Sequence, residues 1–131
     1  MDMLDKAREV FSGDLFATQT VGITIDEAEE GRAVCSLEIG ERHLNANGIV
    51  MGGAIFTLAD FAFAVASNII NMNTASLGSQ ITYLSPAKCS RLTAESKRVK
   101  EGRTTCYYVT DITDENGRHI AQVTTTGFIM H

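Results

Sequence analysis

One acidic residue stands alone in the longest apolar stretch of this chain, and a pair of glycines precedes it. Between Gly52 and Asn73 the only charged side chain is Asp60. A carboxyl group on an apolar helix has its charged form destabilised, which makes it more basic and suits it to act as a general base or a nucleophile. A glycine at the start of a helix offers an unpaired backbone N–H that can polarise a carbonyl. Two interpretations that give Asp60 no catalytic role also stay open: an exposed acid on a dimer rim, and an acid held by a nearby hydroxyl.

The stretch that carries Asp60 is predicted to be a long helix. Residues 54–70 contain no Gly or Pro, and seventeen residues are too many for one buried strand, so length favours a helix of about 26 Å. Being apolar nearly all round, it must be buried in protein or in lipid. A lipid-spanning helix needs about 20 apolar residues, and a carboxylate facing hydrocarbon is expensive. These two points favour a protein core.

The spacing of the two candidate groups has a consequence for assembly. Gly52 and Asp60 are eight residues apart, which is about 12 Å along one helix. Both cannot lie within about 3 Å of the same carbonyl. If both act on it, they must come from different subunits. A helix apolar on its outer face also needs a second copy to cover it, so we predict a homodimer with a shared site.

The elements around this helix are predicted from hydrophobic periodicity. Met3 to Phe11 has the pattern of a short amphipathic helix. Alternation of apolar and polar residues predicts strands over residues 20–26, 33–39, 77–86, 91–99, 104–113 and 118–130, with polar turns at 27–31, 100–103 and 114–117. Two strands, one long helix and four strands in a meander predict an α+β fold with one helix on one face of an antiparallel sheet. With no linker or repeat, residues 1–131 are expected to form a single domain.

Composition and charge narrow the possible functions. Hydrophobic residues are 44% and charged residues 21%, as in an ordinary globular protein. A net charge of −5 argues against nucleic acid and anionic membranes as partners. The charged first residues lack the apolar core of a secretory signal, so we expect a cytoplasmic protein. Three scattered cysteines, Cys35, Cys89 and Cys106, predict reduced thiols, with no metal site and no disulfide.

A composite motif then indicates a family. The run that carries it is His43-Leu44-Asn45, Gly48, Gly52-Gly53 and Leu58-Ala59-Asp60, followed by Ile81 to Lys88. It resembles the signature of hotdog-fold acyl-CoA thioesterases of the phenylacetic-acid-degradation (PaaI-like) type, over nearly the whole chain. The resemblance implies a long central helix wrapped by a six-stranded antiparallel sheet, with a short N-terminal helix. It also implies a homodimer with joined sheets, and we expect the dimers to pair as a tetramer.

The resemblance assigns roles to particular residues. It implies catalytic roles for Asn45 on the loop, the Gly52 amide, Asp60, and Ser76 on the following strand. The substrate would be an acyl-CoA or aryl-CoA, with no cofactor. Residues expected to contact it are His43, Gly53, Phe61, Lys88 and Arg91, with His43 mainly orienting the loop. Six of the 11 Lys and Arg residues lie between positions 88 and 103 and could bind the phosphates of coenzyme A, although a solvated strand face explains them equally well.

Two alternatives remain. The family commonly has His before the glycine pair, where this chain has Met51, so a non-catalytic acyl-CoA-binding or ligand-sensing hotdog protein stays possible. Hotdog hydratases place a His five residues after a helical Asp, or use a His and an acid in a different loop motif. Here the position five residues after Asp60 is Val65, which disfavours a hydratase.

Overall fold

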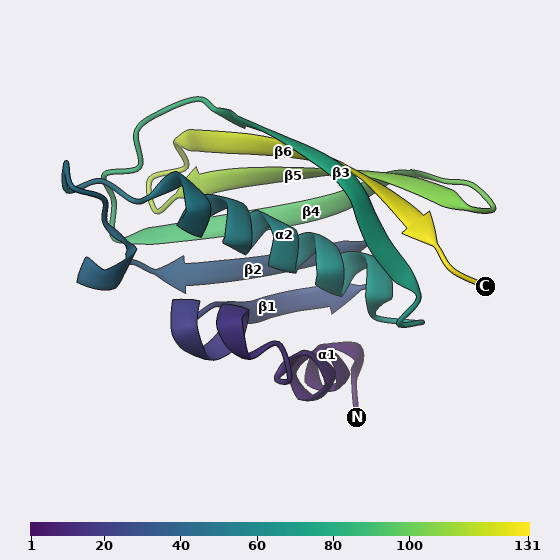
Figure 1. Cartoon of the computed structure of the whole chain (residues 1–131). Helices are drawn as coiled ribbons and strands as arrows, with labels where there is room; N and C mark the ends of the chain where they lie inside the picture. Colours follow the sequence, from purple (N-terminus) through teal and green to yellow (C-terminus); the bar gives the residue numbers. More distant parts are fainter.

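Helix α2 lies across one face of a six-stranded antiparallel sheet that curls around it (Figure 1). The computed structural model describes all residues, 1–131. The elements are α1 (Met3–Phe11), a π-helix η1 (Phe16–Val21), β1 (Thr24–Glu29), β2 (Arg32–Glu38), a 3-10 turn η2 (Glu41–His43), α2 (Gly52–Asn68), β3 (Thr74–Tyr83), β4 (Arg91–Glu101), β5 (Thr105–Asp114) and β6 (His119–Ile129). The strand order in the sheet is β1-β2-β4-β5-β6-β3. The predicted α+β arrangement, with its long helix, six strands and short N-terminal helix, is confirmed.

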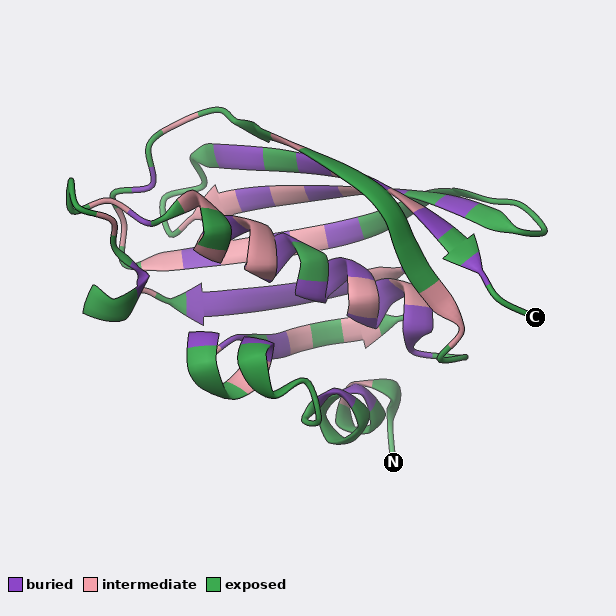
Figure 2. Ribbon diagram, in the orientation of Figure 1, coloured by how far each residue is buried: buried purple, intermediate pink, exposed green.

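The core lies between α2 and the inner face of the sheet. Nine residues of α2 are buried, and β2 beneath it is buried along most of its length (Figure 2). The Phe63 ring meets the Tyr108 ring edge-on, with centroids 5.2 Å apart. At the end of α2, the Asn68 side chain accepts from the Thr74 N–H at 2.9 Å and donates to the Ala64 carbonyl at 3.1 Å. This side-chain cap explains why the helix stops two residues before the predicted end.

One outer strip of α2 differs from the rest of the helix. An apolar surface nearly all round was expected, but the residues turned from the sheet are small or polar: Gly53, Thr57, Asp60, Ala64 and Ser67. Their hydroxyls are satisfied within the helix, since Thr57 donates to the Gly53 carbonyl and Ser67 to the Phe63 carbonyl, both at 2.8 Å. The helix is thus apolar nearly all round, as predicted, apart from one narrow outer strip, and the sheet and the N-terminal segment together cover its apolar side chains, as in the packing of Phe11 against Phe61.

The N-terminal segment covers one edge of the sheet. Asp2 caps α1 by accepting from the Asp5 N–H at 2.8 Å, and the Arg8 side chain donates to the Ile25 carbonyl on β1 at 3.0 Å. The strand predicted over 20–26 begins only at Thr24, because Phe16–Val21 is a π-helix that ends at Gly22, with φ +93°. That strand also continues to Glu29, so the predicted turn at 27–31 shrinks to two residues.

The opposite edge of the sheet is open. Strand β3 has no charged residue or proline, and eight of its ten residues are exposed. Its exposed apolar side chains include Leu77 and Tyr83, which are 65% and 50% exposed. Acidic side chains line β1, whereas nothing within the chain protects β3. An unprotected edge of this kind can pair with another strand.

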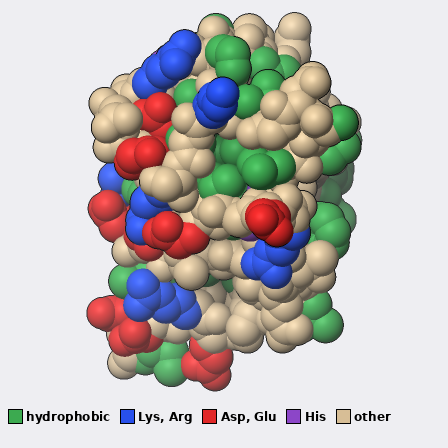
Figure 3. Space-filling view, turned by 90° about the vertical axis from the view of Figure 1, so that its left-hand side faces the viewer, with side chains coloured by type: hydrophobic (Ala, Val, Ile, Leu, Met, Phe, Trp, Pro, Cys, Tyr) green, Lys and Arg blue, Asp and Glu red, His purple; other side chains and the backbone are tan.

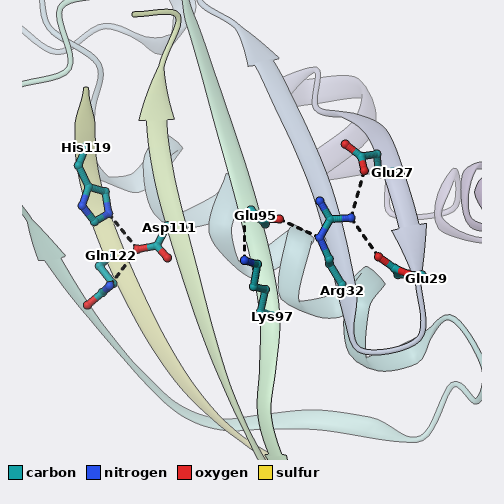
Figure 4. Close-up of polar contacts among 8 residues, drawn as sticks. All are labelled: Glu27, Glu29, Arg32, Glu95, Lys97, Asp111, His119 and Gln122. Carbon is teal, nitrogen blue, oxygen red and sulfur yellow. Dashed lines mark hydrogen bonds and ion pairs between the residues drawn. The ribbon is translucent and has the colours of Figure 1, made fainter. Parts of the chain in front are cut away.

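The outer face of the sheet is a network of charged and polar side chains (Figure 4). Arg32 reaches Glu27, Glu29 and Glu95 at 2.8–3.1 Å, and these hydrogen bonds raise the pKa of its guanidinium. On β5, the Asp111 carboxylate accepts from the side chains of His119 and Gln122, which lie on β6. None of the helices combines the length and the hydropathy that a membrane-spanning segment requires.

Candidate active site

The first turn of α2 presents two free backbone donors. The N–H groups of Gly52 and Gly53 have no acceptor within the chain, whereas the next two amides both donate to the Met51 carbonyl. The helix dipole adds positive potential at this end. The Tyr83 hydroxyl donates to the Gly52 carbonyl at 3.0 Å, and a Cβ on residue 52 would lie 2.7 Å from that hydroxyl oxygen. A side chain at this position would have to displace the end of the Tyr83 ring, and the Gly52 amide is left free to bind an oxygen of a ligand.

This end of the molecule is hollowed and apolar. A cavity of about 430 Å³ is lined by Ile49, Val50, Gly52, Ile55, Tyr83, Leu84, Ser85, Pro86 and Ala87. Figure 3 views the molecule from this end, where apolar side chains gather and acidic and basic side chains are intermixed around them. The free Gly52 amide therefore lies beside a cavity of the size that small-molecule ligands occupy.

The loop before α2 is fixed by two side chains. Asn45 Oδ1 accepts from the N–H groups of Asn47 and Ile49 at 2.9 and 3.2 Å, while its Nδ2 group has no acceptor within the chain. The buried His43 ring uses both nitrogens, because Nδ1 accepts from the Gly40 N–H at 2.9 Å and Nε2 donates to the Val21 carbonyl at 2.7 Å. These bonds define a neutral imidazole with its proton on Nε2. The His43 ring therefore has a structural role, whereas the Nδ2 group of Asn45 is free to donate to a ligand.

Asp60 lies on the outer side of α2 and has no hydrogen-bond or ionic partner. It opens into a cavity of about 310 Å³, which also includes Asp14, Phe16 and Phe61. Partial burial raises the pKa of Asp60, and repulsion from Asp14 raises it further. No hydroxyl holds this carboxylate, so that interpretation is wrong, whereas an acid on a dimer rim stays open because Asp60 is exposed in the single chain. An unpartnered acid with raised basicity is chemically available as a base or nucleophile.

The predicted residues separate into several groups. Asn45, His43, Gly52 and Gly53 lie together where α2 begins, and Asp60 lies two turns along the helix. Ser76 is at the other end of the exposed strand, seven residues before Tyr83 and so about 23 Å away. One chain therefore does not bring Ser76 to Gly52.

The three remaining residues that were predicted to contact the substrate lie in different surroundings. Phe61 is buried, and its ring packs edge-on against Phe11 at 6.2 Å while also lining the Asp60 cavity. Lys88 is exposed and has no acidic partner. Arg91 lies on the outer face of the sheet, where its guanidinium is held by Glu38 at 2.7 Å and by Ser36 at 2.9 Å. The basic residues between positions 88 and 103 thus form no single patch, because acids alternate with them.

Two residues of the site were missed by the sequence reasoning. Tyr83 was expected only as a strand residue, yet its hydroxyl holds the Gly52 carbonyl. Asp14 had no predicted role, yet it shares the cavity of Asp60. Neither contact has a local signal, since each joins residues more than thirty positions apart in the sequence.

Comparison with known proteins places the chain in a family. The model of the thioesterase superfamily matches residues 47–121. Human acyl-coenzyme A thioesterase 13 is 32% identical over 104 residues, which cover 76% of this chain and 74% of that protein. The chain belongs to the thioesterase superfamily. Acyl-coenzyme A thioesterase PaaI of Escherichia coli is 29% identical over 116 residues, covering 88% of this thioesterase and 82% of PaaI. A relative in Archaeoglobus fulgidus is 36% identical over 96 residues, but the match spans only 62% of that protein.

Solved structures agree with this membership. A Streptococcus pneumoniae structure, described as a hypothetical thioesterase protein with coenzyme A, has a TM-score of 0.84 and 28% identity, covering 92% of this chain and 96% of that one. The E. coli PaaI structure has a TM-score of 0.88 and supports the fold, at 24% identity. The predicted PaaI-like hotdog family and the predicted enzyme class, a thioesterase, are confirmed.

Proposed function

We propose that this thioesterase hydrolyses an acyl-CoA or aryl-CoA thioester to the free acid and coenzyme A, in a site shared between two copies of the chain. The observation that carries the proposal is the pair of unpaired groups on α2, the Gly52 amide and the Asp60 carboxylate. Relatives named as acyl-coenzyme A thioesterases and a structural neighbour described with coenzyme A support the choice of substrate.

The chemistry follows from those two groups. The thioester carbonyl oxygen accepts from the Gly52 N–H, which stabilises the negative charge that develops on it. Asp60 either takes a proton from the attacking water or attacks the carbonyl carbon itself. In both routes the C–S bond then breaks, and coenzyme A leaves as the thiolate, which takes up a proton. In the second route water then hydrolyses the mixed anhydride formed on Asp60, which releases the free acid and restores the carboxylate. The Nδ2 group of Asn45, which has no acceptor within the chain, would hold the water or the thioester.

The need for two copies comes from geometry. Gly52 and Asp60 lie on the same straight element, about 12 Å apart along its axis. A carbonyl carbon within about 3 Å of one group cannot also be within reach of the other. The Asp60 that acts at one Gly52 therefore belongs to the second copy.

The open edge of the sheet supports a route to such a dimer. Antiparallel pairing of β3 with its own copy would set the Tyr83 end of one strand beside the Thr74 end of the other. Because Tyr83 holds Gly52, the second copy's Ser76 would approach the Gly52 end of the first. Ser76 is too distant from Gly52 within one chain, so this pairing gives it a place in the shared site.

Substrate-binding roles can now be ranked. Lys88 has no acidic partner and follows the loop that lines the Gly52 cavity, so it suits a phosphate of coenzyme A. Arg91 is occupied on the opposite face of the sheet by Glu38 and Ser36, which makes it the weaker candidate. His43 and Gly53 line the neighbouring cavity of about 440 Å³.

The shared site is tested by complementation between two inactive variants, Asn45→Ala and Asp60→Ala. The variants are unfolded and refolded together, and release of free thiol from an acyl-CoA panel is measured. A mixed dimer carries one doubly defective site and one intact site, so random pairing should restore about a quarter of wild-type activity. Each variant refolded alone is the control. If the mixture stays inactive although mass analysis shows mixed dimers, the site lies within one chain.

A non-catalytic acyl-CoA-binding role is the second candidate, favoured by Met51. This side chain is 58% exposed at the N-cap of α2, where PaaI-like thioesterases commonly carry His. A binder would take up acyl-CoA in calorimetry without releasing thiol. Turnover by the wild type that is lost in Asp60→Asn would exclude this role.

A further inference from the structure

The N-terminal segment supplies one wall of the cavity in which Asp60 lies. Residues 14–17 line one side of it, and Thr57, Asp60, Phe61 and Ala64 of α2 line the other. Leu15 and Phe16 are 57% and 63% exposed, and both line this wall. Two large apolar side chains are thus held in solvent beside the catalytic acid. They provide a surface that an apolar ligand group can cover.

Phe16 occupies a special position in this wall. A second cavity, of about 440 Å³, lies nearer the start of α2 and includes Met51 and Gly53. Phe16 and Thr57 are the two residues that line both cavities. The Phe16 side chain therefore stands at the boundary between the space beside Asp60 and the space beside Gly53.

The wall is held in place at both ends. Before it, the Phe11 ring packs edge-on against Phe61 of α2. After it, the Val21 carbonyl accepts from His43 at 2.7 Å and from Arg42 at 3.2 Å. Phe16 begins a π-helix, a rare conformation that is frequent at functional sites. The backbone that carries Phe16 is therefore held on both sides, which keeps this residue at the boundary between the two cavities.

We propose that Phe16 determines which acyl groups the enzyme accepts, by closing the Asp60 cavity toward the Gly53 cavity. This proposal rests on the proposed thioesterase function and names the acyl side of its site. The cavity of about 310 Å³ lies at the lower end of small-molecule pockets. With Phe16 in place the acyl group is confined to that space, and a longer chain meets the aromatic ring.

The walls also select the chemistry of the acyl group. The Asp60 cavity contains two carboxylates, Asp14 and Asp60, and no cationic side chain. Arg42 lines only the neighbouring cavity and donates to a backbone carbonyl. An acyl group that ends in its own carboxylate would be repelled, so the accepted class is neutral and apolar.

The test compares butyryl-, octanoyl-, dodecanoyl- and succinyl-CoA with Phe16→Ala, Phe16→Trp and the wild type. Phe16→Ala should raise the ratio of kcat/KM for dodecanoyl-CoA over butyryl-CoA about tenfold or more, because one methylene in an apolar pocket is worth roughly 10-fold to 200-fold. Phe16→Trp should lower the ratio. Succinyl-CoA should be the poorest substrate of the wild type. Phe128→Ala is the matched control, since Phe128 is an exposed phenylalanine on β6 outside both cavities, and it should leave the ratio unchanged.

Binding of the same acyl-CoAs is also measured by calorimetry. This measurement distinguishes failure of the Phe16 proposal from failure of the proposed thioesterase function. An unchanged ratio in a folded, active Phe16→Ala, or an equal change in Phe128→Ala, would overturn the role of Phe16 while leaving the thioesterase function intact. Absence of turnover in the wild type would overturn the function. In that case the binding data decide. If affinity for acyl-CoA rises with acyl-chain length only in Phe16→Ala, the role of Phe16 is still supported. If affinity does not depend on chain length in the wild type or in any variant, the role of Phe16 is overturned. If Phe16→Ala fails to fold, Phe16→Trp and Phe16→Leu decide by the same ratio.

Discussion

A single methyl group added at Gly52 should disturb both the stability and the chemistry of this thioesterase. A Cβ there would lie 2.7 Å from the Tyr83 hydroxyl oxygen and 3.0 Å from the ring carbon that bears it. The ring must move, and the hydroxyl loses its bond to the Gly52 carbonyl. Because Tyr83 is 50% exposed and its ring can swing aside, the cost in the free energy of unfolding should come mainly from the lost hydrogen bond, about 1 kcal/mol. If the start of α2 shifts by about 1 Å instead, kcat should fall about 10²-fold.

Two measurements check this prediction for Gly52→Ala. Urea denaturation followed by circular dichroism gives the free energy of unfolding, and thiol release from an acyl-CoA gives kcat. Gly53→Ala is the matched stability control, because no atom lies within 4 Å of a Cβ at that position. It should gain about 0.5–1 kcal/mol from the lower chain entropy of alanine.

A double variant identifies the cause. Truncation of the ring in Tyr83→Ala removes the obstacle, so Gly52→Ala should cost clearly less stability in that background, with a coupling of about 1 kcal/mol. If Gly52→Ala retains wild-type stability and turnover, or if its cost is the same with and without the Tyr83 ring, the steric reasoning fails.

Three other contacts set measurable properties of the chain. Asp14→Asn removes a charge that raises the pKa of Asp60, so the acidic limb of the kcat/KM profile should move to lower pH, and an unmoved limb would contradict the repulsion. Glu115 has its pKa lowered from 4.5 to about 2, first by its own backbone N–H and then by a neighbouring hydroxyl and amides. It stabilises the fold above about pH 4.5, and this contribution is lost as the pH falls toward 2; Glu115→Gln should therefore lower Tm at pH 7 but not at pH 2. Thr110 donates to Ser96 at 2.9 Å, both fully buried, so Ser96→Ala should cost about 1–3 kcal/mol in urea denaturation, whereas adding Thr110→Val should restore most of it.

The order of elements was predictable because periodicity is a local property. Alternating apolar residues mark the inner face of each strand, and the Asp-Glu-Asn-Gly turn joins β5 to β6 where it was expected. The region before Thr24 was predicted wrongly for the same reason. Val21 and Ile23 continue an alternating pattern, but Gly22 takes a positive φ and the Ile23 N–H returns to the Ala17 carbonyl at 2.9 Å. Alternation alone does not distinguish a strand from this turn.

The site was predictable only in part. Asp60 and Gly52 stand out by residue type, since one is the sole acid in an apolar stretch and the other precedes a helix. Tyr83 and Asp14 became visible only in three dimensions, because their partners lie 31 and 46 positions away in the sequence. The assignment of Asn45 and Ser76 to catalysis rests on the family resemblance and stays a prediction.

The unequal edges of the sheet bear on how far assembly can proceed. On one side, the acidic strand β1 lies against α1, which binds its backbone through Arg8 and Ile25. On the other, β3 is bare. A chain with one open edge can pair with only one neighbour through its strands, so we expect strand pairing to stop at two copies. Without α1, only its acidic side chains would protect the β1 edge against a further strand. We therefore expect the short helix at the start of the chain to limit strand pairing to the β3 edge.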